Sequence, residues 1–144
     1  MGINRKKILL FCILILSVLS SIASEIEPND TVAQQVSLGE SVVGSISSAT
    51  DLDYYVVSID SPGVLTVNFQ REVESFDGYQ FYIFDNSSNR LASEFCTRSC
   101  ITSQGESLSI SAGISAAGTY NIGVISDSSY STPPGSYTME ATFE

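Results

Sequence analysis

Hydrophobic and polar residues alternate along most of the chain after residue 40. Side chains two positions apart in an extended strand point to the same face, so an alternating run gives a strand one apolar face. Helical periodicity is almost absent over the same stretch. The apolar stripes are Tyr55, Val57 and Ile59; Leu65, Val67 and Phe69; Phe81 and Ile83; Tyr120, Ile122 and Val124; and Tyr137, Met139 and Ala141.

Turn residues such as Asp60-Ser61-Pro62-Gly63 and Pro133-Pro134-Gly135 separate these runs and limit the predicted strands. About eight strands are predicted, at Ser41–Ser47, Asp53–Ile59, Gly63–Gln70, Tyr79–Asp85, Arg90–Phe95, Ser107–Ala112, Thr119–Ser126 and Ser136–Phe143. Short antiparallel strands with one apolar face each can bury those faces by packing as two sheets. The pattern therefore predicts an all-β fold, a two-sheet antiparallel β-sandwich of jelly-roll or Greek-key type.

The start of the chain is typical of a secretory signal peptide. Three basic residues at positions 5–7 precede an apolar run at 8–19, and a small-residue cleavage site ends at Ala23. This run is shorter than the roughly 20 apolar residues of a membrane span, although an uncleaved anchor remains an alternative. We therefore expect a signal peptide at 1–23, a single domain at 24–144, and no stable membrane span after cleavage.

The composition is acidic, with 16 Asp and Glu against six Lys and Arg and a formal net charge of −10. Three of the six basic residues lie in the predicted leader, so the mature domain is more acidic still. Nucleic acids and anionic lipids are bound through Lys and Arg, so this balance argues against both as partners. Acidity suits a divalent cation, and it also suits a solvated exterior that needs no ligand.

Two cysteines, Cys96 and Cys100, lie in the predicted mature domain. An even number of cysteines in an oxidising compartment predicts a disulfide bond. The loop that it closes is short, so the bond would stiffen a turn more than it would stabilise the fold. A redox or metal role is the alternative, but there is no His and no third mature Cys to complete a tetrahedral site.

Oxygen-bearing side chains cluster in two short segments, just after the predicted leader and before the second predicted strand. They are Glu25, Glu27, Asn29 and Asp30 in the first segment, and Asp51 and Asp53 in the second. Calcium binds six to eight oxygens from carboxylates, amides and main-chain carbonyls, so this set predicts a Ca²⁺ site. In the alternative, Asn29 and Asp30 cap a turn and the two aspartates begin a strand in solvent.

Catalysis has little support, because the chain contains no His and therefore no Ser-His-Asp or Cys-His arrangement. Binding through aromatic residues is better supported. Tyr54, Tyr79, Tyr82 and Tyr130 are predicted to lie on outward faces or in loops, where Tyr offers rigid contact area for peptides or sugars. The chain has no Trp, which favours a protein ligand over a carbohydrate, and packing at the sandwich edges is the alternative for each tyrosine.

The order of short motifs along the chain resembles the bacterial pre-peptidase C-terminal (PPC) domain. These motifs are Glu-x-Glu-Pro-Asn-Asp-Thr from Glu25, Val-x-Gly-Ser-Ile, Asp-x-Asp-Tyr-Tyr, Pro-Gly-Val-Leu-Thr-Val, Phe-Tyr-Ile-Phe-Asp, Ala-Gly-Thr-Tyr-Asn-Ile and Gly-Ser-Tyr-Thr-Met. The resemblance spans Glu25 to Phe143, and each motif is weak taken singly. The PPC family is similar to the collagen-binding modules of bacterial collagenases, which are jelly-roll sandwiches with a Ca²⁺ site at the N-terminal linker.

The resemblance implies a non-catalytic secreted module of the kind appended to peptidases. It also implies that Glu25, Glu27, Asn29, Asp30 and Asp53 match metal-ligand positions of the collagen-binding relatives, to which ligand chemistry adds Asp51. No peptidase precedes the domain here, so we expect a stand-alone, monomeric binding or adhesion module, secreted, periplasmic or at the cell surface. Its partner would be an extracellular protein or polysaccharide. The alternative is an accessory domain that assists the export or folding of a separately encoded secreted peptidase, or restrains it.

Overall fold

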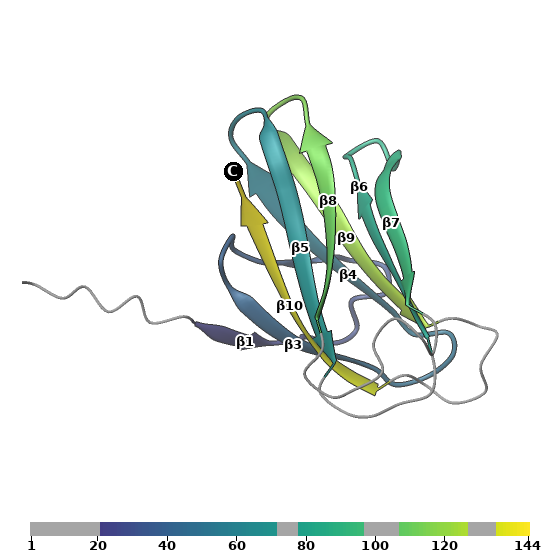
Figure 1. Ribbon diagram of the computed structural model, residues 1–144. Coiled ribbons are helices and arrows are strands. Elements are labelled where there is room, and N and C mark those ends of the chain that lie inside the picture. The colour runs from purple at the N-terminus through teal and green to yellow at the C-terminus, as the bar shows by residue number, and fades with distance from the viewer. Residues whose placement is uncertain (1–20, 72–77, 97–106, 127–134) are drawn as a thin grey trace, which may run out of the picture.

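The computed structural model describes residues 21–71, 78–96, 107–126 and 135–144, and these contain ten β-strands in two five-stranded sheets (Figure 1). Sheet A contains β1 (Ile22–Ser24), β3 (Ser41–Ile46), β10 (Gly135–Phe143), β5 (Gly63–Arg71) and β8 (Ser107–Ile114), in that order. Sheet B contains β2 (Gln34–Gln35), β4 (Leu52–Ile59), β9 (Gly118–Ser126), β6 (Tyr79–Phe84) and β7 (Arg90–Cys96). In the described part of the chain, no helix is long and apolar enough to cross a membrane.

The strand order is that of a jelly roll with two short strands added. Without β1 and β2 the sheets read β3-β10-β5-β8 and β4-β9-β6-β7, and all their pairs are antiparallel. Strands β1 and β2 pair in parallel with β3 and β4, the edge strands of that jelly roll. The predicted all-β sandwich is therefore confirmed.

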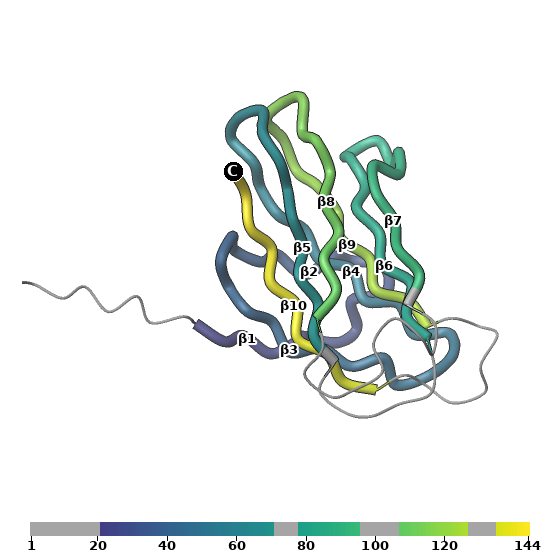
Figure 2. The backbone as a smooth tube through the Cα atoms, viewed as in Figure 1, coloured from purple at the N-terminus to yellow at the C-terminus, as the bar shows by residue number. Residues whose placement is uncertain are grey.

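The eight predicted strands correspond to β3 to β10, with ends that differ by at most two residues. Strands β1 and β2 were not predicted, because segments of three and two residues carry no readable alternation. The tube in Figure 2 shows the chain running from β1 through β2 before it enters β3. We call residues 25–33, which lead from the edge of sheet A to the edge of sheet B, the crossing segment.

The core lies between the sheets and consists of the inward residues of the alternating stripes. Within it the Phe69 ring from sheet A stacks on the Phe81 ring from sheet B, with ring centroids 4.0 Å apart. The largest fully buried side chains are Tyr55, Tyr137, Phe69, Phe81, Ile46, Ile59, Leu65, Ile83, Ile122, Met139, Val42 and Val57. Burying these side chains is the main force that holds the two sheets together.

The prediction that Tyr79 faces outward is wrong, because this residue is buried in the core. It shares a strand face with Phe81 and Ile83, and its ring lies 5.6 Å from that of Phe81 and 5.9 Å from that of Tyr137. Its hydroxyl donates to the main-chain oxygen of Gly135 at 3.0 Å. A buried tyrosine needs such an acceptor, which the end of β10 supplies.

Candidate metal centre

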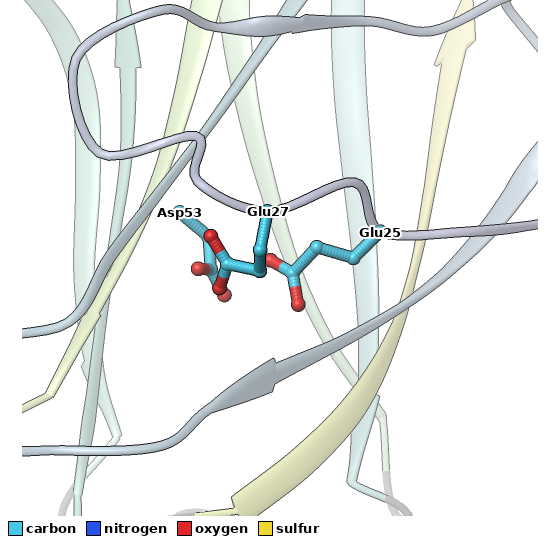
Figure 3. A group of neighbouring side chains, drawn as sticks. All are labelled: Glu25, Glu27 and Asp53. Carbon is cyan, nitrogen blue, oxygen red and sulfur yellow. The ribbon is translucent and has the colours of Figure 1, made fainter.

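Three carboxylates converge where the crossing segment lies against β4 (Figure 3). Glu25 and Glu27 belong to the crossing segment, and Asp53 points toward them from β4. One oxygen from each carboxylate lies within 4.8 Å of the other two. Oxygens that bind one Ca²⁺ at 2.3–2.6 Å lie at most about 5 Å apart, so the spacing matches a shared ion.

Main-chain and amide groups hold the two glutamates in place. The Ser45 N–H in β3 donates to Glu25 Oε2 at 2.8 Å, and the Asn29 N–H donates to Glu27 Oε2 at 3.0 Å. The Asn29 side-chain amide donates to Glu25 Oε1, also at 3.0 Å. Each glutamate therefore has a fixed position even though Glu27 is exposed to solvent.

Two core tyrosines extend the cluster into the sandwich. The Tyr137 hydroxyl donates to Asp53 Oδ2 at 2.6 Å and lies 2.7 Å from the Tyr55 hydroxyl, which is 3.1 Å from Glu25 Oε1. Burial raises the pKa of both hydroxyls, so they remain neutral donors. Gly44 leaves the room that they need, because a Cβ there would lie 2.5 Å from the Tyr137 hydroxyl and 2.6 Å from that of Tyr55.

Two buried oxygens beside this cluster have no hydrogen-bond partner among the described residues, Asn29 Oδ1 and Asp53 Oδ1. Their residues are 1% and 0% exposed, so water does not replace the missing partner freely. A buried acceptor without a donor is costly, and a cation is a partner that accepts several such oxygens at once. The donor set of three carboxylates and an amide oxygen fits a hard divalent cation, with remaining positions left to water.

The electrostatics show the cost of bringing these acids together without a cation. Burial raises the pKa of Asp53 to about 9, and the hydrogen bond and charge of Glu25 act in the same direction against the Tyr137 hydrogen bond. The pKa of Glu27 is also raised, first by desolvation and then by the neighbouring carboxylates, although Asn29 N–H opposes the shift. A bound cation favours the ionised form of every one of these groups.

The other two predicted ligands lie beside the cluster and outside its core of three carboxylates. Asp30 Oδ1 accepts the Leu52 N–H at 3.1 Å, and Asp51 Oδ2 accepts the Ser47 hydroxyl at 2.7 Å. The Ser48 carbonyl in the same turn accepts the Asp51 N–H. These two aspartates fasten the ends of the turn before β4, while their charges still act on Glu27.

Tyr54 and Tyr82, predicted to bind a ligand, are not part of the carboxylate cluster. Tyr54 and Tyr82 are partly exposed and point away from the core, in the positions that the alternation predicted. Tyr130 and Cys100 lie outside the described residues, so the predicted disulfide with Cys96 stays a prediction.

Sequence reasoning placed Tyr55 and Tyr137 in the core and missed their part in the site. A signal was present, because each is the one hydroxyl-bearing residue of its inward stripe and each opens that stripe. Gly44 was also missed, and it is the Cα partner of Tyr137 in the β3–β10 pair. Recognising this trio would have required the strand register, which the sequence does not contain.

A scan against protein-family models and a search of curated proteins find no match for this chain. Solved structures of similar fold include the pre-peptidase C-terminal domain of collagenase from Bacillus anthracis, at 15% identity and a TM-score of 0.54 over 82% of this chain and 100% of that one. They also include PliG, a periplasmic inhibitor of g-type lysozyme from Aeromonas hydrophila, at 12% identity and a TM-score of 0.55 over 86% and 98%. A third is the K3 cleaved adhesin domain of Lys-gingipain from Porphyromonas gingivalis, at 15% identity and a TM-score of 0.50 over 72% and 71%.

The chain is thus a jelly-roll β-sandwich, a fold that it shares with these three structures. Within that class its fold is similar to the PPC domain, over the whole length of the collagenase domain, so the predicted resemblance is confirmed for the fold. Identities of 15% or less carry no ligand or partner across, so function has to be argued from this chain's own residues.

Proposed function

We propose that this protein is a secreted, non-catalytic binding module whose N-terminal segment is held in place by Ca²⁺. The observation that carries the proposal is the meeting of Glu25, Glu27 and Asp53 around two buried oxygens that lack partners. Ca²⁺ suits an all-oxygen set of mixed exposure better than a transition metal does, because the described cluster offers neither imidazole nor thiolate.

The bound ion would be structural. It would neutralise carboxylates that otherwise repel one another, while Glu25, Glu27 and Asn29 fasten the crossing segment to Asp53 in β4. Because that segment leads from sheet A to sheet B, the same ion would join both sheets at one edge of the sandwich. The part of the module that contacts a partner would then rest on a pre-ordered scaffold.

Secretion and the absence of catalysis are parts of the same proposal. Residues 1–23 resemble a secretory leader, which favours export. Calcium sites of extracellular modules have millimolar dissociation constants and are filled outside the cell. The chain contains no His to serve as a general base, and its acidic cluster is tied to main-chain and tyrosine donors. Similar folds occur in PPC and adhesin domains, which supports a module that binds other molecules.

The test is calcium binding measured by titration calorimetry, together with the thermal midpoint in Ca²⁺ and in excess chelator. We expect one site per chain and a midpoint several degrees higher with Ca²⁺, because a ligand that binds only the folded state stabilises it. Glu27→Gln should weaken binding at least tenfold, while Glu40→Gln, in the turn before β3, should leave it unchanged. An unchanged midpoint together with no binding heat would refute the calcium site.

Restraint of a secreted enzyme is the second candidate. The fold matches PliG over nearly the whole of both chains, and PliG is an enzyme inhibitor that consists of one such domain. Affinity capture from culture medium separates the candidates, because an inhibitor or accessory domain should recover a secreted enzyme. An adhesion module should recover envelope or matrix polymers instead.

A further inference from the structure

A pocket of about 380 Å³ lies on the outer face of sheet B. Tyr54, Asn121 and Phe84 line it from the neighbouring strands β4, β9 and β6. Thr31 in the crossing segment lines it on the β4 side, and Ser88 in the turn between β6 and β7 lines it on the other. The pocket is thus a walled hollow across three strands, within the size range of small-molecule sites.

A glycine brings the two aromatic rings of the pocket together. Gly123 in β9 is the Cα partner of Tyr54 on one side and of Tyr82 on the other. A Cβ at position 123 would lie 3.2 Å from Tyr54 Cε1 and 3.6 Å from Phe84 Cε2, so both rings lean over the glycine. The result is an aromatic surface that crosses β4, β9 and β6 without interruption.

The same surface continues past the pocket toward β7. Tyr82 stacks beside Phe84 with ring centroids 5.5 Å apart, and the Phe95 ring packs edge-on against Tyr82 with centroids 6.4 Å apart. Phe95 is 50% exposed, which is unusual for a side chain of this size without a partner. The aromatic strip is therefore longer than the pocket and has room for more than one ring of a ligand.

Polar groups stand at the margin of the aromatic surface. The Asn121 side chain has no hydrogen-bond partner among the described residues, so both its amide groups are open to a ligand. Asp30 also lines the pocket, with Oδ1 held by the Leu52 N–H and Oδ2 left as an acceptor. Ser88 has a φ of 63°, and its N–H donates to the Asp85 carbonyl, so its turn is held in an uncommon backbone conformation.

The outer face of sheet A is different and serves as an internal comparison. There the hydroxyls of Thr66 and Ser111 lie 2.9 Å apart, and the Ser109 hydroxyl donates to Asn68 Oδ1 at 2.5 Å. Polar side chains on that face satisfy one another, whereas on sheet B aromatic rings surround an amide without a partner. Among the described residues, the outer face of sheet B combines flat apolar area with unused hydrogen-bonding groups, so the two faces of the sandwich are not equivalent.

We infer that this pocket binds a neutral saccharide, with a sugar ring packed on Tyr54 and Phe84 and its hydroxyls bonded to Asn121 and Asp30. The inference rests on the proposed function as a binding module and gives that module a ligand class. The C–H face of a pyranose is attracted to the negative face of an aromatic ring. Its equatorial hydroxyls lie in the ring plane, where an amide and a carboxylate at the margin can bond to them.

Other ligand classes fit this surface less well. An anion would meet Asp30 and a chain of formal charge −10, and none of the described residues that line the pocket is basic. A peptide that adds a strand to the sheet needs a free edge, but β9 and β6 are paired on both sides, and β2 covers the middle of β4 at Tyr55 and Val56. The sequence favoured a protein ligand because Trp is absent, yet two rings converging over Gly123 provide a comparable flat area.

The test is a titration of the purified protein, in Ca²⁺, with xylotriose, cellotriose, maltotriose and chitotriose, followed by amide NMR shifts. We expect at least one to bind with shifts confined to β4, β9, β6 and residues 30–33. Tyr54→Ala and Asn121→Ala should each weaken that binding at least tenfold, and Tyr54→Phe should retain it. Thr66→Ala on sheet A should leave it unchanged.

The outcomes separate this inference from the proposed function. No binding by any neutral oligosaccharide, shifts that map elsewhere, or a proline-rich peptide binding at Tyr54 in place of sugars would overturn the saccharide site. Calcium binding measured on the same sample, without sugar, reports on the proposed module independently. Should Tyr54→Ala fail to fold, Asn121→Ala alone tests the site, because its amide lines the same pocket.

Discussion

Asp53 is expected to destabilise the calcium-free protein and to stabilise the calcium-bound protein. It is fully buried, one oxygen accepts the Tyr137 hydroxyl, and the other has no partner among the described residues. A buried carboxylate without enough donors destabilises the folded chain, whereas the same group bound to a cation stabilises it. Substitution of this residue should therefore have opposite effects on the two forms.

The first prediction concerns Asp53→Asn. Without a cation, Asp53 has a pKa of about 9 and must take up a proton on folding at neutral pH, whereas the amide is neutral without one. In chelator at neutral pH the variant should therefore be as stable as the wild type or melt a few degrees higher. It also removes a ligand, so Ca²⁺ affinity should fall at least tenfold and the stabilisation by Ca²⁺ should shrink. Scanning calorimetry in chelator and in Ca²⁺ checks both; a variant that melts lower than wild type in chelator would contradict this account.

The second prediction is the pH dependence of the calcium-free protein. An acid whose pKa is higher in the folded state binds its proton more tightly when folded, so its contribution to stability is present at low pH. For Asp53 that contribution is lost as pH rises from its ordinary pKa of 3.8 toward about 9. The slope for one such group is at most about 1.4 kcal/mol per pH unit.

The measurement is urea unfolding in chelator between pH 5 and pH 8, compared with Asp53→Asn to remove the effect of overall charge. The free energy of unfolding of the wild type should fall relative to the variant as pH rises. With saturating Ca²⁺ the trend should disappear or reverse, because the ion binds the deprotonated acid. A wild-type stability that rises relative to Asp53→Asn in chelator would rule out the raised pKa.

At this scale the sequence predicted the chemistry of the site better than its geometry. Glu25, Glu27 and Asp53 could be chosen because their residue types and spacing suit Ca²⁺. Asp30 and Asp51 are carboxylates like the three residues of the cluster. The structure shows that one oxygen of each accepts a local hydrogen bond. Ligand type can be read from the sequence, but the direction of a side chain depends on tertiary contacts.

At the scale of elements, the pairing of β3 with β10 decides whether the site can form. Gly44 in β3 faces Tyr137 in β10, and the missing side chain leaves space for the two tyrosine hydroxyls. A strand glycine is normally unfavourable, so its presence here indicates close approach of another group. Gly44 in β3 therefore determines whether the tyrosine hydroxyls can reach the carboxylate cluster.

The third prediction concerns Gly44→Ala. Its methyl group would overlap the Tyr137 and Tyr55 hydroxyls, and overpacking of this kind costs about 1–3 kcal/mol. We also expect weaker Ca²⁺ binding, because the displaced hydroxyls are those that contact Asp53 and Glu25. Gly113→Ala in β8 is the matched control, since a Cβ there meets nothing within 4 Å. If urea unfolding shows equal destabilisation of the two variants, the contact between position 44 and the tyrosine hydroxyls is not the cause.

The fourth prediction concerns the crossing segment, which has few main-chain hydrogen bonds of its own. In the described structure it is attached to the sheets mainly through the side chains of Glu25 and Asp30, which accept from β3 and β4, and by the Glu25 N–H to the Val43 carbonyl. Hydrogen exchange of residues 25–33 should therefore slow at least tenfold on adding Ca²⁺, while amides in β5 and β9 should not change. Uniform protection across all strands would instead indicate global stabilisation.

Alternation predicted most of β3 to β10 well because these strands bury one face, so side-chain period and sheet position agree. Strand β7 is the exception, because none of its residues 90–95 is buried. It did not predict β1 and β2, whose pairing depends on strands elsewhere in the chain. The error at Tyr79 has a different origin, because its stripe with Phe81 and Ile83 already indicated an inward face. A polar hydroxyl alone is not a reason to place tyrosine outside when a main-chain acceptor lies within the core.

At the scale of the whole molecule, a common jelly roll carries two unlike outer faces and one edge rich in carboxylates. The same fold occurs in structures at 15% identity or less, because many sequences with suitable alternation can pack its core. The features that distinguish this chain are local: Gly123 beneath two rings, Gly44 beneath two hydroxyls, and the acids of the crossing segment. Variation in function within such a fold is expected to arise at positions like these.

The route of the crossing segment between the two sheets has a mechanical consequence. If an uncleaved leader tethers the chain through its N-terminus while its sheet B face holds a ligand, tension enters at β1 and must pass along residues 25–33 before it reaches β4. An ion shared by Glu25, Glu27 and Asp53 would carry that load across the sandwich edge in place of the short strand pairs. The pulling force that the attachment withstands would then depend on the calcium level outside the cell, strong in calcium-rich surroundings and readily released when calcium is scarce.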